Sequence, residues 1–506
     1  MLPPKVLEES PKNLSTNFKG DKIDITFDEY FKLSSEFTEI SISPSLEITP
    51  VYKIKKKVLE IVFKDSLEKN TTYTINFGKA IQDVNESNIL KNYSYVFATG
   101  PVLDSLQISG TVFSSNDNKP VKDATVFLFH IEQDTLFGKK KPSLFTTTDS
   151  VGHFSLKNLK EGKYTIYGLK EVNSDRIYNS PNEEIAFLKE PISLVRNTSD
   201  IILKLFKGIP ERLRILDKKI EKDGRITYIF NKPIKNPSIT FIDPTNLKDP
   251  IINFSNKGDT ASVWLRSYDF DSLKVAINSD KVALDTIKLT RSKKDTYERT
   301  ILFSNNLSGG KIKPGTSLQL NFNLPIENIN KQSVELLEDS IPKTGFFINQ
   351  LSQSNRVYTV LYPWRIKKIY TLKFNEGAIK DIYNTANKPL KLDFELDEVE
   401  NYGNLSLNVV KEDSTKNYIL QIFNSTKNLY KEEIIKENKT VVFNNIPISK
   451  YTLRVIEDTN NNGEFDTGNV KLKTQPEKVW FFDKEIITRA NWDREEKIII
   501  PKKFPD

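Results

Sequence analysis

Tyr73-Thr74-Ile75-Asn76-Phe77 is the stretch of this chain that indicates its fold most plainly. Apolar and polar side chains alternate along it, and a β-strand places alternate side chains on opposite faces of a sheet. The same alternation, rich in Val, Ile, Thr, Tyr and Phe, recurs in Ile23-Asp24-Ile25-Thr26-Phe27, Tyr164-Thr165-Ile166-Tyr167 and Leu318-Gln319-Leu320-Asn321-Phe322. Clusters of Ser, Asn, Asp and Gly separate these runs at sandwich-like spacing. The sequence therefore predicts an all-β protein.

The length of the chain requires several such units. Its 506 residues are too many for a single domain with one hydrophobic core, and roughly three to five domains are expected at this length. Helical periodicity is scarce, and residues 430–437 are the one helix candidate.

One internal repeat joins two distant segments. Lys163-Tyr164-Thr165-Ile166 matches Lys450-Tyr451-Thr452-Leu453, and the offset of 287 residues is kept as far as the match of Glu171 with Asp458. An ungapped match of this length indicates two copies of one module.

A second repeat links other parts of the chain. The stretch 73–83 resembles 370–381, and the strand openings at 230–234 and 322–326 share a pattern. The two repeats together predict a tandem array of about five β-sandwiches in the order A–B–A–A–B. Asp83 and Asp381 fall at equivalent positions of this repeat, so we expect them to cap turns and not to form a catalytic pair.

The two module types resemble known families. Module A resembles the bacterial Ig-like domain of S-layer proteins and Bacteroidota lipoproteins, on Asn70-Thr71-Thr72-Tyr73 and Phe97-Ala98-Thr99-Gly100. Module B resembles the carboxypeptidase regulatory-like, transthyretin-like sandwich, on Gly110-Thr111-Val112 and Gly162-Lys163-Tyr164. The tandem is similar to Ig-like domain-containing outer-membrane lipoproteins of Bacteroidota. The expected domains are therefore a bacterial Ig-like domain at 1–101, a transthyretin-like sandwich at 102–206, an Ig-like sandwich at 207–304, a second bacterial Ig-like domain at 305–401 and a C-terminal transthyretin-like sandwich at 402–506.

Composition excludes several kinds of chemistry. The chain has no Cys and only two His, so disulfide scaffolds, thiol catalysis and thiolate metal sites are ruled out. His130 and His153 do not begin a His-x-x-Glu pair, and we expect both to be ordinary strand or turn residues. The net charge of +7 is too small for a nucleic-acid binder of this size. No nucleotide-binding or hydrolase motif is present, so the chain is expected not to be an enzyme.

One local motif predicts an oxygen-ligated metal site. Asp458, Asn460, Asn462, Glu464 and Asp466 lie in a loop with Gly at its sixth position, in the pattern of a calcium loop. It resembles the calcium loops in B repeats of Gram-positive adhesins. The alternative is a polar turn whose Asp and Asn side chains cap their own backbone. The earlier copy of the loop carries Arg176 in place of the Gly, which disfavours a metal there.

Aromatic and basic residues suggest further surfaces. Trp480 and Trp492 lie in the last module and Trp364 follows Tyr362-Pro363, so aromatic rings are candidates for stacking on a glycan. Core or inter-module packing is the alternative. The lysine run 139–141 fits either contact with anionic lipid or a solvated hairpin tip.

The expected function is a non-enzymatic scaffold or adaptor at the bacterial outer membrane. Its partner would be an envelope protein or a membrane β-barrel complex, with a carbohydrate-binding or adhesin-like surface protein as the alternative. Met1-Leu2-Pro3-Pro4-Lys5 does not open a signal peptide. A cytoplasmic protein and an exported chain anchored by an upstream lipid both remain open, and the tandem of Ig-like modules favours the exported one.

Overall fold

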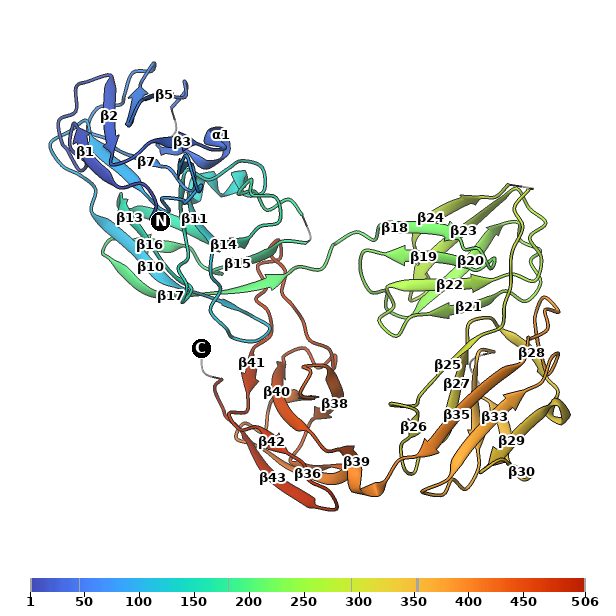
Figure 1. Ribbon diagram of the computed structural model, residues 1–506. Coiled ribbons are helices and arrows are strands. Elements are labelled where there is room, and N and C mark those ends of the chain that lie inside the picture. Colours follow the sequence, from blue (N-terminus) through green and yellow to red (C-terminus); the bar gives the residue numbers. More distant parts are fainter. Residues whose placement is uncertain (1, 45, 181, 293, 352–354, 505–506) are drawn as a thin grey trace.

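The chain is a tandem array of β-sandwich modules, seen in a computed structural model that describes residues 2–44, 46–180, 182–292, 294–351 and 355–504 (Figure 1). The modules follow one another around a ring, so that the last one returns to the second. We name them first to fifth by their strands. The domain limits at 101, 206, 304 and 401 stay predictions.

The first module is a sandwich of one four-stranded sheet, β1-β2-β6-β5, and a three-stranded sheet, β4-β7-β9, with the pair β3-β8 at one end. Its alternating strands bury one face each, as in β2, where Ile23, Ile25 and Phe27 are inaccessible to solvent. Its elements are β1 (Val6–Ser10), β2 (Lys22–Phe27), β3 (Phe31–Leu33), α1 (Glu36–Glu39), β4 (Ser41–Ser43), β5 (Val51–Lys55), β6 (Val58–Val62), β7 (Thr72–Asn76), β8 (Ile81–Asp83) and β9 (Ser94–Ala98).

The second module joins its strands into one curved sheet, β12-β11-β14-β15-β17-β10-β13, with β16 beside β14. Strand β11 is apolar on both faces because Val126 and Leu128 face the main core while Phe127 and Phe129 form a second aromatic cluster. Its elements are β10 (Leu106–Ser114), β11 (Thr125–His130), the 3-10 helix η1 (Ile131–Leu136), β12 (Leu144–Thr147), β13 (His153–Leu159), β14 (Gly162–Lys170), β15 (Glu184–Phe187), β16 (Ile192–Leu194) and β17 (Thr198–Lys207).

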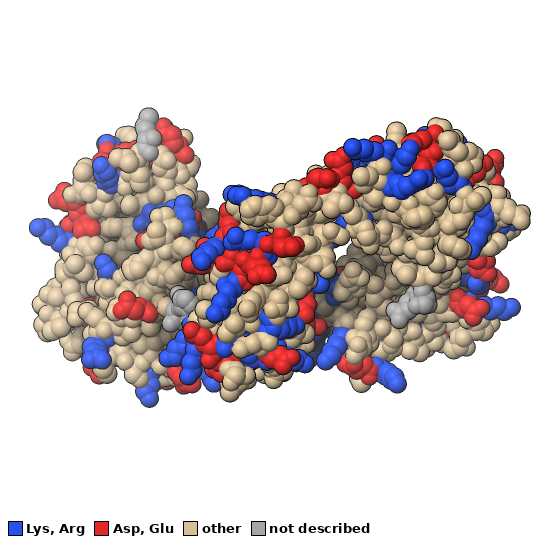
Figure 2. Space-filling view, turned by 90° about the horizontal axis from the view of Figure 1, so that it is seen from below, with Lys and Arg blue, Asp and Glu red and all other residues tan. Residues whose placement is uncertain are grey.

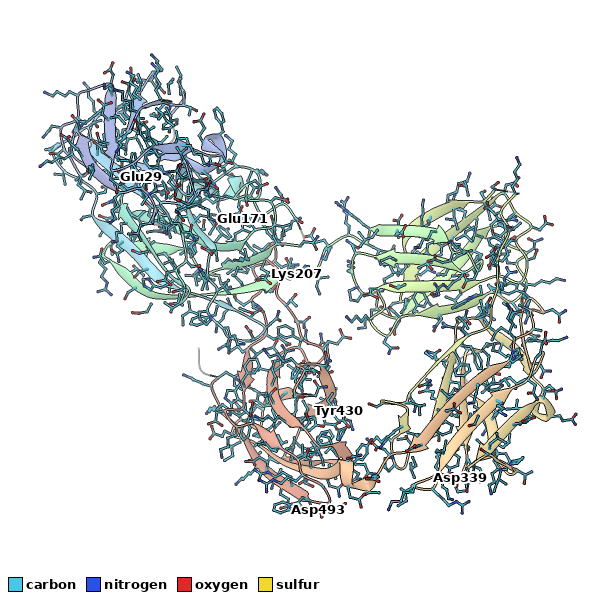
Figure 3. The ribbon with its side chains drawn as sticks, in the orientation of Figure 1. Glu29, Glu171, Lys207, Asp339, Tyr430 and Asp493 are labelled. Atoms are coloured by element: carbon cyan, nitrogen blue, oxygen red, sulfur yellow. The ribbon has the colours of Figure 1, made fainter. Side chains whose placement is uncertain are left out.

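The third module packs the sheet β18-β19-β22-β21 on β20-β23-β24. The chain enters it after Lys207, which marks the end of β17 in Figure 3. Trp264, at the end of β22, is fully buried in the core of the fourth module, so these two modules share packing. The strands are β18 (Ile215–Ile220), β19 (Ile226–Phe230), β20 (Pro237–Asp243), β21 (Ile251–Phe254), β22 (Thr260–Trp264), β23 (Ser272–Ser279) and β24 (Val282–Thr290).

The fourth module repeats the strand order of the first, with sheets β25-β27-β32-β31 and β26-β35-β33-β29-β30 and the pair β28-β34. This shared order is the structural counterpart of the second sequence repeat. Its elements are β25 (Phe303–Asn305), β26 (Lys311–Ile312), β27 (Leu318–Phe322), β28 (Ile326–Ile329), η2 (Lys331–Ser333), β29 (Val334–Glu338), β30 (Ile341–Lys343), β31 (Phe347–Gln350), β32 (Val357–Leu361), β33 (Ile369–Phe374), β34 (Ile379–Asp381), β35 (Leu390–Leu396) and η3 (Val399–Asn401).

The fifth module has its strands in the same order as the second, including a parallel pair: β36 with β43 corresponds to β10 with β17. Its described strands form two sheets, β39-β36-β43 and β38-β37-β40-β41, whereas the pairing of β15 with β17 joins those of the second module into one. The helix predicted at residues 430–437 is wrong, because residues 430–435 lie in strand β38, which pairs with β37, and residues 436–437 lie in the bend that follows. Cross-strand pairing overrides its weak helical pattern. The strands are β36 (Tyr402–Lys411), β37 (Asn417–Phe423), β38 (Leu429–Ile435), β39 (Lys439–Pro447), β40 (Lys450–Asp458), β41 (Val479–Phe481), β42 (Ile486–Ile487) and β43 (Asp493–Ile500).

None of the helices in the described part of the chain has the length and apolar character needed to cross a bilayer.

Acidic and basic side chains are interspersed on the face of the molecule shown in Figure 2. Such mixing fits the small net charge of +7.

Candidate functional site

The predicted calcium loop connects β40 to β41 in the fifth module, over residues 459–478. Strand β40 ends at Asp458, whose side chain is buried. Both of its carboxylate oxygens accept backbone hydrogen bonds, from Asn462 N at 3.1 Å and from Gly463 N at 3.0 Å. Gly463 has φ of 75° and permits the sharp turn that brings these amides back to Asp458.

The other predicted ligands form a hydrogen-bonded set of their own. Asp466 Oδ2 accepts from the side-chain amides of Asn460 at 2.5 Å and Asn462 at 3.0 Å. The Asn462 side-chain oxygen accepts from the backbone of Glu464 at 2.7 Å. The structure therefore brings Asp458, Asn460, Asn462 and Asp466 into one loop, whereas Glu464 contributes its backbone amide.

A second buried carboxylate, Glu477, closes the base of the loop, and the sequence reasoning missed it. One Glu477 oxygen accepts from Thr459 N at 2.7 Å, and the other accepts from Asp466 N at 3.1 Å. Burial raises the pKa of Glu477 above its usual range. Its position in the chain is the signal that could have identified it, because Glu477 lies two residues before strand β41, which returns to pair with β40.

In this conformation the predicted ligands are hydrogen-bonded to other groups of the loop, as in a polar, self-capped turn. Among the described residues, no group of three or more His, Asp or Glu side chains is placed to hold a metal ion. The side-chain nitrogens of Asn460 and Asn462 face Asp466 here. To bind calcium, both amides would have to turn so that their oxygens face an ion shared with Asp466. The calcium site stays a prediction.

The equivalent loop of the second module is built on the same plan. The strand pairing that places Glu184 opposite Lys170 brings Glu171 and Glu183 to the positions of Asp458 and Glu477. Glu171 accepts a hydrogen bond from Arg176 N at 2.7 Å, and Glu183 is fully buried. Figure 3 places Glu171 inside the second module.

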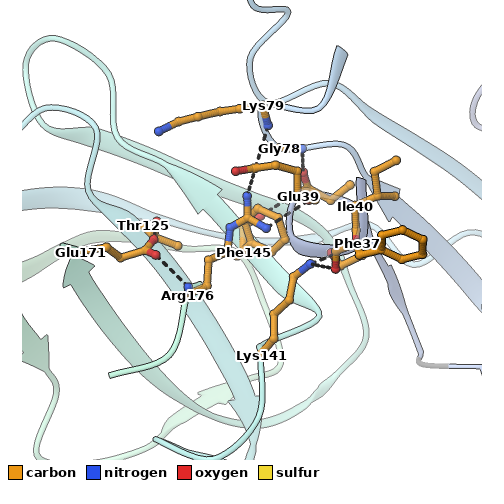
Figure 4. A network of polar contacts seen from close by, with 12 residues as sticks. Phe37, Glu39, Ile40, Gly78, Lys79, Thr125, Lys141, Phe145, Glu171 and Arg176 are labelled. Atoms are coloured by element: carbon orange, nitrogen blue, oxygen red, sulfur yellow. Dashed lines mark hydrogen bonds and ion pairs between the residues drawn. The ribbon is translucent and has the colours of Figure 1, made fainter. Parts of the chain in front are cut away.

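Arg176 occupies the position of Gly463 in the fifth module, and its side chain connects this loop to the first module. Its guanidinium forms an ion pair with Glu39 and donates to the Glu39 backbone oxygen at 3.0 Å (Figure 4). It also lies 4.0 Å from the centre of the Phe145 ring. Only 6% of the Arg176 side chain is exposed. Burial lowers its pKa, although Glu39 and Glu171 oppose the shift. The cation expected to disfavour a metal is thus an inter-module anchor.

Lys141, at the end of the lysine run 139–141, strengthens the same interface. Its ammonium group donates to the backbone oxygen of Phe37, within α1, at 3.3 Å and to that of Ile40, just after α1, at 3.0 Å (Figure 4). Burial lowers the pKa of Lys141 to about 8. This lysine contacts protein and is not part of a solvated hairpin tip.

The two tryptophans predicted to form a glycan platform lie in different surroundings. Trp480 is half-buried and packs with Phe482 and Phe504 against the core of the fifth module. Trp492 is 59% exposed in the turn before β43, with the Arg489 guanidinium 5.3 Å from its ring centre. No ring contact joins Trp480 to Trp492 in the described part of the chain, and a ligand-facing role for the two rings stays a prediction.

A different aromatic surface lies in the fourth module. A hollow of about 300 Å³ is lined by aromatic, aliphatic and hydroxyl-bearing side chains. Phe347 is 59% exposed at its rim. The lining residues are Thr316, Ser317, Gly345, Phe347, Leu361, Tyr362, Pro363 and Trp364.

The carboxylates Asp83 and Asp381 are turn caps, as expected. Asp83 is fully buried and accepts from the backbone amides of residues 86–88, and Asp381 accepts from Tyr383 N at 2.9 Å and Thr385 N at 2.8 Å. Burial alone would raise the pKa of Asp83, but the amides that it accepts from lower it.

The two histidines occupy ordinary structural positions. His130 ends β11 and packs 4.4 Å from Tyr164, measured between ring centres, while His153 is an exposed residue at the start of β13. Burial lowers the pKa of His130. Neither histidine lies in a group of metal-binding side chains within the described ranges.

Comparison with known proteins identifies one family. Residues 2–99 match the family profile "Bacterial Ig-like domain". This match covers the first module and bears out the bacterial Ig-like resemblance there. No curated protein matches the chain.

Several solved structures are distantly similar. The Bacillus anthracis TIE protein is 12% identical over 98% of this chain and 75% of its own, with a TM-score of 0.15. The major pilin subunit BcpA of Bacillus cereus is 12% identical over 79% of this chain and 100% of its own, with a TM-score of 0.15. SGBP-B of the Bacteroides ovatus mixed-linkage glucan utilization locus, solved with a mixed-linkage heptasaccharide, is 11% identical over 66% of this chain and 86% of its own, with a TM-score of 0.18. These similarities are too weak to support a function.

Proposed function

We propose that the protein is a non-enzymatic scaffold at the bacterial outer membrane, of the Bacteroidota Ig-like lipoprotein kind, that binds an envelope protein or a membrane β-barrel complex. The observation that carries this proposal is that loops and side chains lock neighbouring modules together. Arg176 and Lys141 fix the first module to the second, and Trp264 joins the third to the fourth. Such a frame holds its docking surfaces in fixed relative positions, which is what a scaffold requires.

The first module offers a docking surface of suitable chemistry. Strand β5 is the edge of its sheet, and Val51 and Ile54 on it are 38% and 43% exposed. A groove of about 530 Å³ lies between this strand, α1 and residues 141–143. Phe37 lines this groove and is 86% exposed. An edge strand beside apolar pockets suits a partner that adds an extended segment to the sheet.

Affinity purification from native membranes tests this proposal. The wild-type chain should recover an envelope protein, and Phe37→Asp should abolish that recovery. Val282→Asp is the matched control, because Val282 is also an exposed apolar residue, at 66%, in the third module. Recovery of the free chain alone would contradict a scaffold role.

Membrane anchorage is part of the same proposal. We place the chain on the exported side of the inner membrane, held by a lipid on a cysteine upstream of Met1. The gene sequence upstream of Met1 tests this directly. A signal peptide that ends in a lipobox cysteine would support it, and an upstream sequence without one would contradict it.

Carbohydrate binding is the second candidate function, favoured by the hollow in the fourth module. Aromatic rings that stack on sugars, together with the hydroxyl groups of Thr316 and Ser317, are the elements of a glycan subsite. A glycan array should then give a signal that Phe347→Ala removes and Trp492→Ala leaves unchanged. A glycan array without any signal would contradict carbohydrate binding and leave the scaffold role as the proposed function.

A further inference from the structure

The far part of the 459–478 loop leaves the fifth module and contacts the second. Asn469 and Thr474 pair with each other across a tight turn, with N···O distances of 2.9 and 3.0 Å. The Asn469 side chain accepts from the backbone amides of Lys471 and Leu472, at 3.0 and 3.1 Å. These bonds lie within the turn, so the turn is preformed, and Lys473 stands near its end with φ of 53°.

Lys473 enters a notch of the second module, which we name the ammonium notch and define by Asp134, Tyr167 and Phe187. Its ammonium nitrogen lies 2.9 Å from the Tyr167 hydroxyl oxygen and 3.7 Å from Asp134 Oδ2. The ring centres of Tyr167 and Phe187 are 5.1 and 5.6 Å away. A carboxylate, a phenol oxygen and aromatic rings are groups that recognise an ammonium ion.

The ammonium notch is assembled by the second module alone. Asp134 lies in η1, where its Oδ1 accepts from Thr165 Oγ1 at 2.8 Å and from the Tyr167 hydroxyl at 2.6 Å. Oδ2 therefore remains directed to the lysine. Phe137 stacks on Tyr167 with ring centres 4.2 Å apart, which fixes the aromatic wall. None of these contacts involves the fifth module, so the notch does not depend on its occupant.

Neighbouring contacts match the rest of the turn to the same surface. Gln475 donates to the Phe187 backbone oxygen at 2.8 Å. Val470 packs against the aromatic cluster on the outer face of β11 and β14. Lys471 forms an ion pair at 3.0 Å with Glu211, which lies in the connection after β17, and both groups are largely exposed. The turn thus presents one apolar and three polar side chains to complementary groups.

We propose that the ammonium notch is a binding site for a lysine-bearing turn, which the chain fills with its own residues 468–476, and that this contact latches the ring closed. Two further hydrogen bonds join the two modules, from Asn118 to Val479 O and from Arg454 to Asn116 O, both at 3.0 Å. Each of these two is a single hydrogen bond, whereas the Lys473 ammonium combines an ion pair, a hydroxyl contact and ring contacts, and the contacts of a charged group weaken with salt. The latch therefore opens when its ammonium ion is removed or screened.

Small-angle scattering of the full chain and a peptide-binding assay together test this proposal. Lys473→Met should increase the radius of gyration at low salt, and high salt should do the same to the wild type. Lys473→Arg retains the cation and should stay compact, as should Lys427→Met, which removes an exposed lysine elsewhere in the fifth module.

Binding of a labelled peptide of residues 468–476 reports directly whether the ammonium notch is free. The peptide should bind the Lys473→Met chain at least tenfold more tightly than the wild type, whose notch is filled. Asp134→Asn should open the ring and fail to bind the peptide, which separates loss of the notch from misfolding of the loop. An unchanged radius in Lys473→Met, or equal peptide binding by that variant and the wild type, would overturn the proposal.

Discussion

Arg176→Met tests whether the anchor between the first and second modules is a buried ion pair. The substitution keeps the length of the side chain but leaves Glu39, of which 12% is exposed, without its cation. Removing one partner of a buried pair costs about 3–5 kcal/mol, because the remaining charge is desolvated and unpaired. Loss of the contact with the Phe145 ring adds about 1 kcal/mol.

Hydrogen exchange read by mass spectrometry suits this measurement, because it reports local opening segment by segment. All four tryptophans lie beyond residue 263, so tryptophan fluorescence does not report on this interface. A loss of about 3 kcal/mol should accelerate exchange by about two orders of magnitude in the two facing segments, α1 with β4 and β12.

Two further variants define the result. Arg196→Met removes an exposed arginine of the same module and should change exchange little. Glu39→Gln added to Arg176→Met should recover part of the loss, because residue 39 then carries no buried charge and can still accept from Lys79 N. If Arg176→Met exchanges like Arg196→Met in both segments, the pair does not anchor the interface.

Three other perturbations follow from the structure. Millimolar Ca²⁺ should raise the melting temperature of the wild type but not of Asp458→Ala, and identical shifts would end the calcium prediction. The folded chain holds fewer protons than the unfolded chain between the lowered pKa of Lys141, about 8, and its usual 10.5. Wild-type stability should therefore rise with pH across this window relative to Lys141→Met, and parallel melting curves would contradict it. Trp264→Ala should lose about 3–5 kcal/mol and lower the calorimetric transitions of the third and fourth modules together, whereas Trp492→Ala should lower neither.

The site illustrates how far sequence reasoning reaches. The motif from Asp458 to Asp466 placed the loop, and Arg176 was identified as the cation at the glycine position. The sequence did not reveal that Glu477 and Glu183 are equivalent. The two loops differ in length, so a constant offset of 287 residues cannot align these two carboxylates. Strand pairing in the folded state aligns them, since each carboxylate lies opposite the residue that opens its loop.

The sequence by itself determined the all-β fold and the repetition of modules, because alternation along a strand and recurrence along the chain are local properties that a single sequence displays. The run from Val126 to Phe129 is strand-like in the sequence and apolar at every position. What covers its outer face was decided by tertiary structure alone. Val470 and Lys473 reach that face from a loop about 300 residues away, and contacts at such separation depend on how every intervening module is oriented.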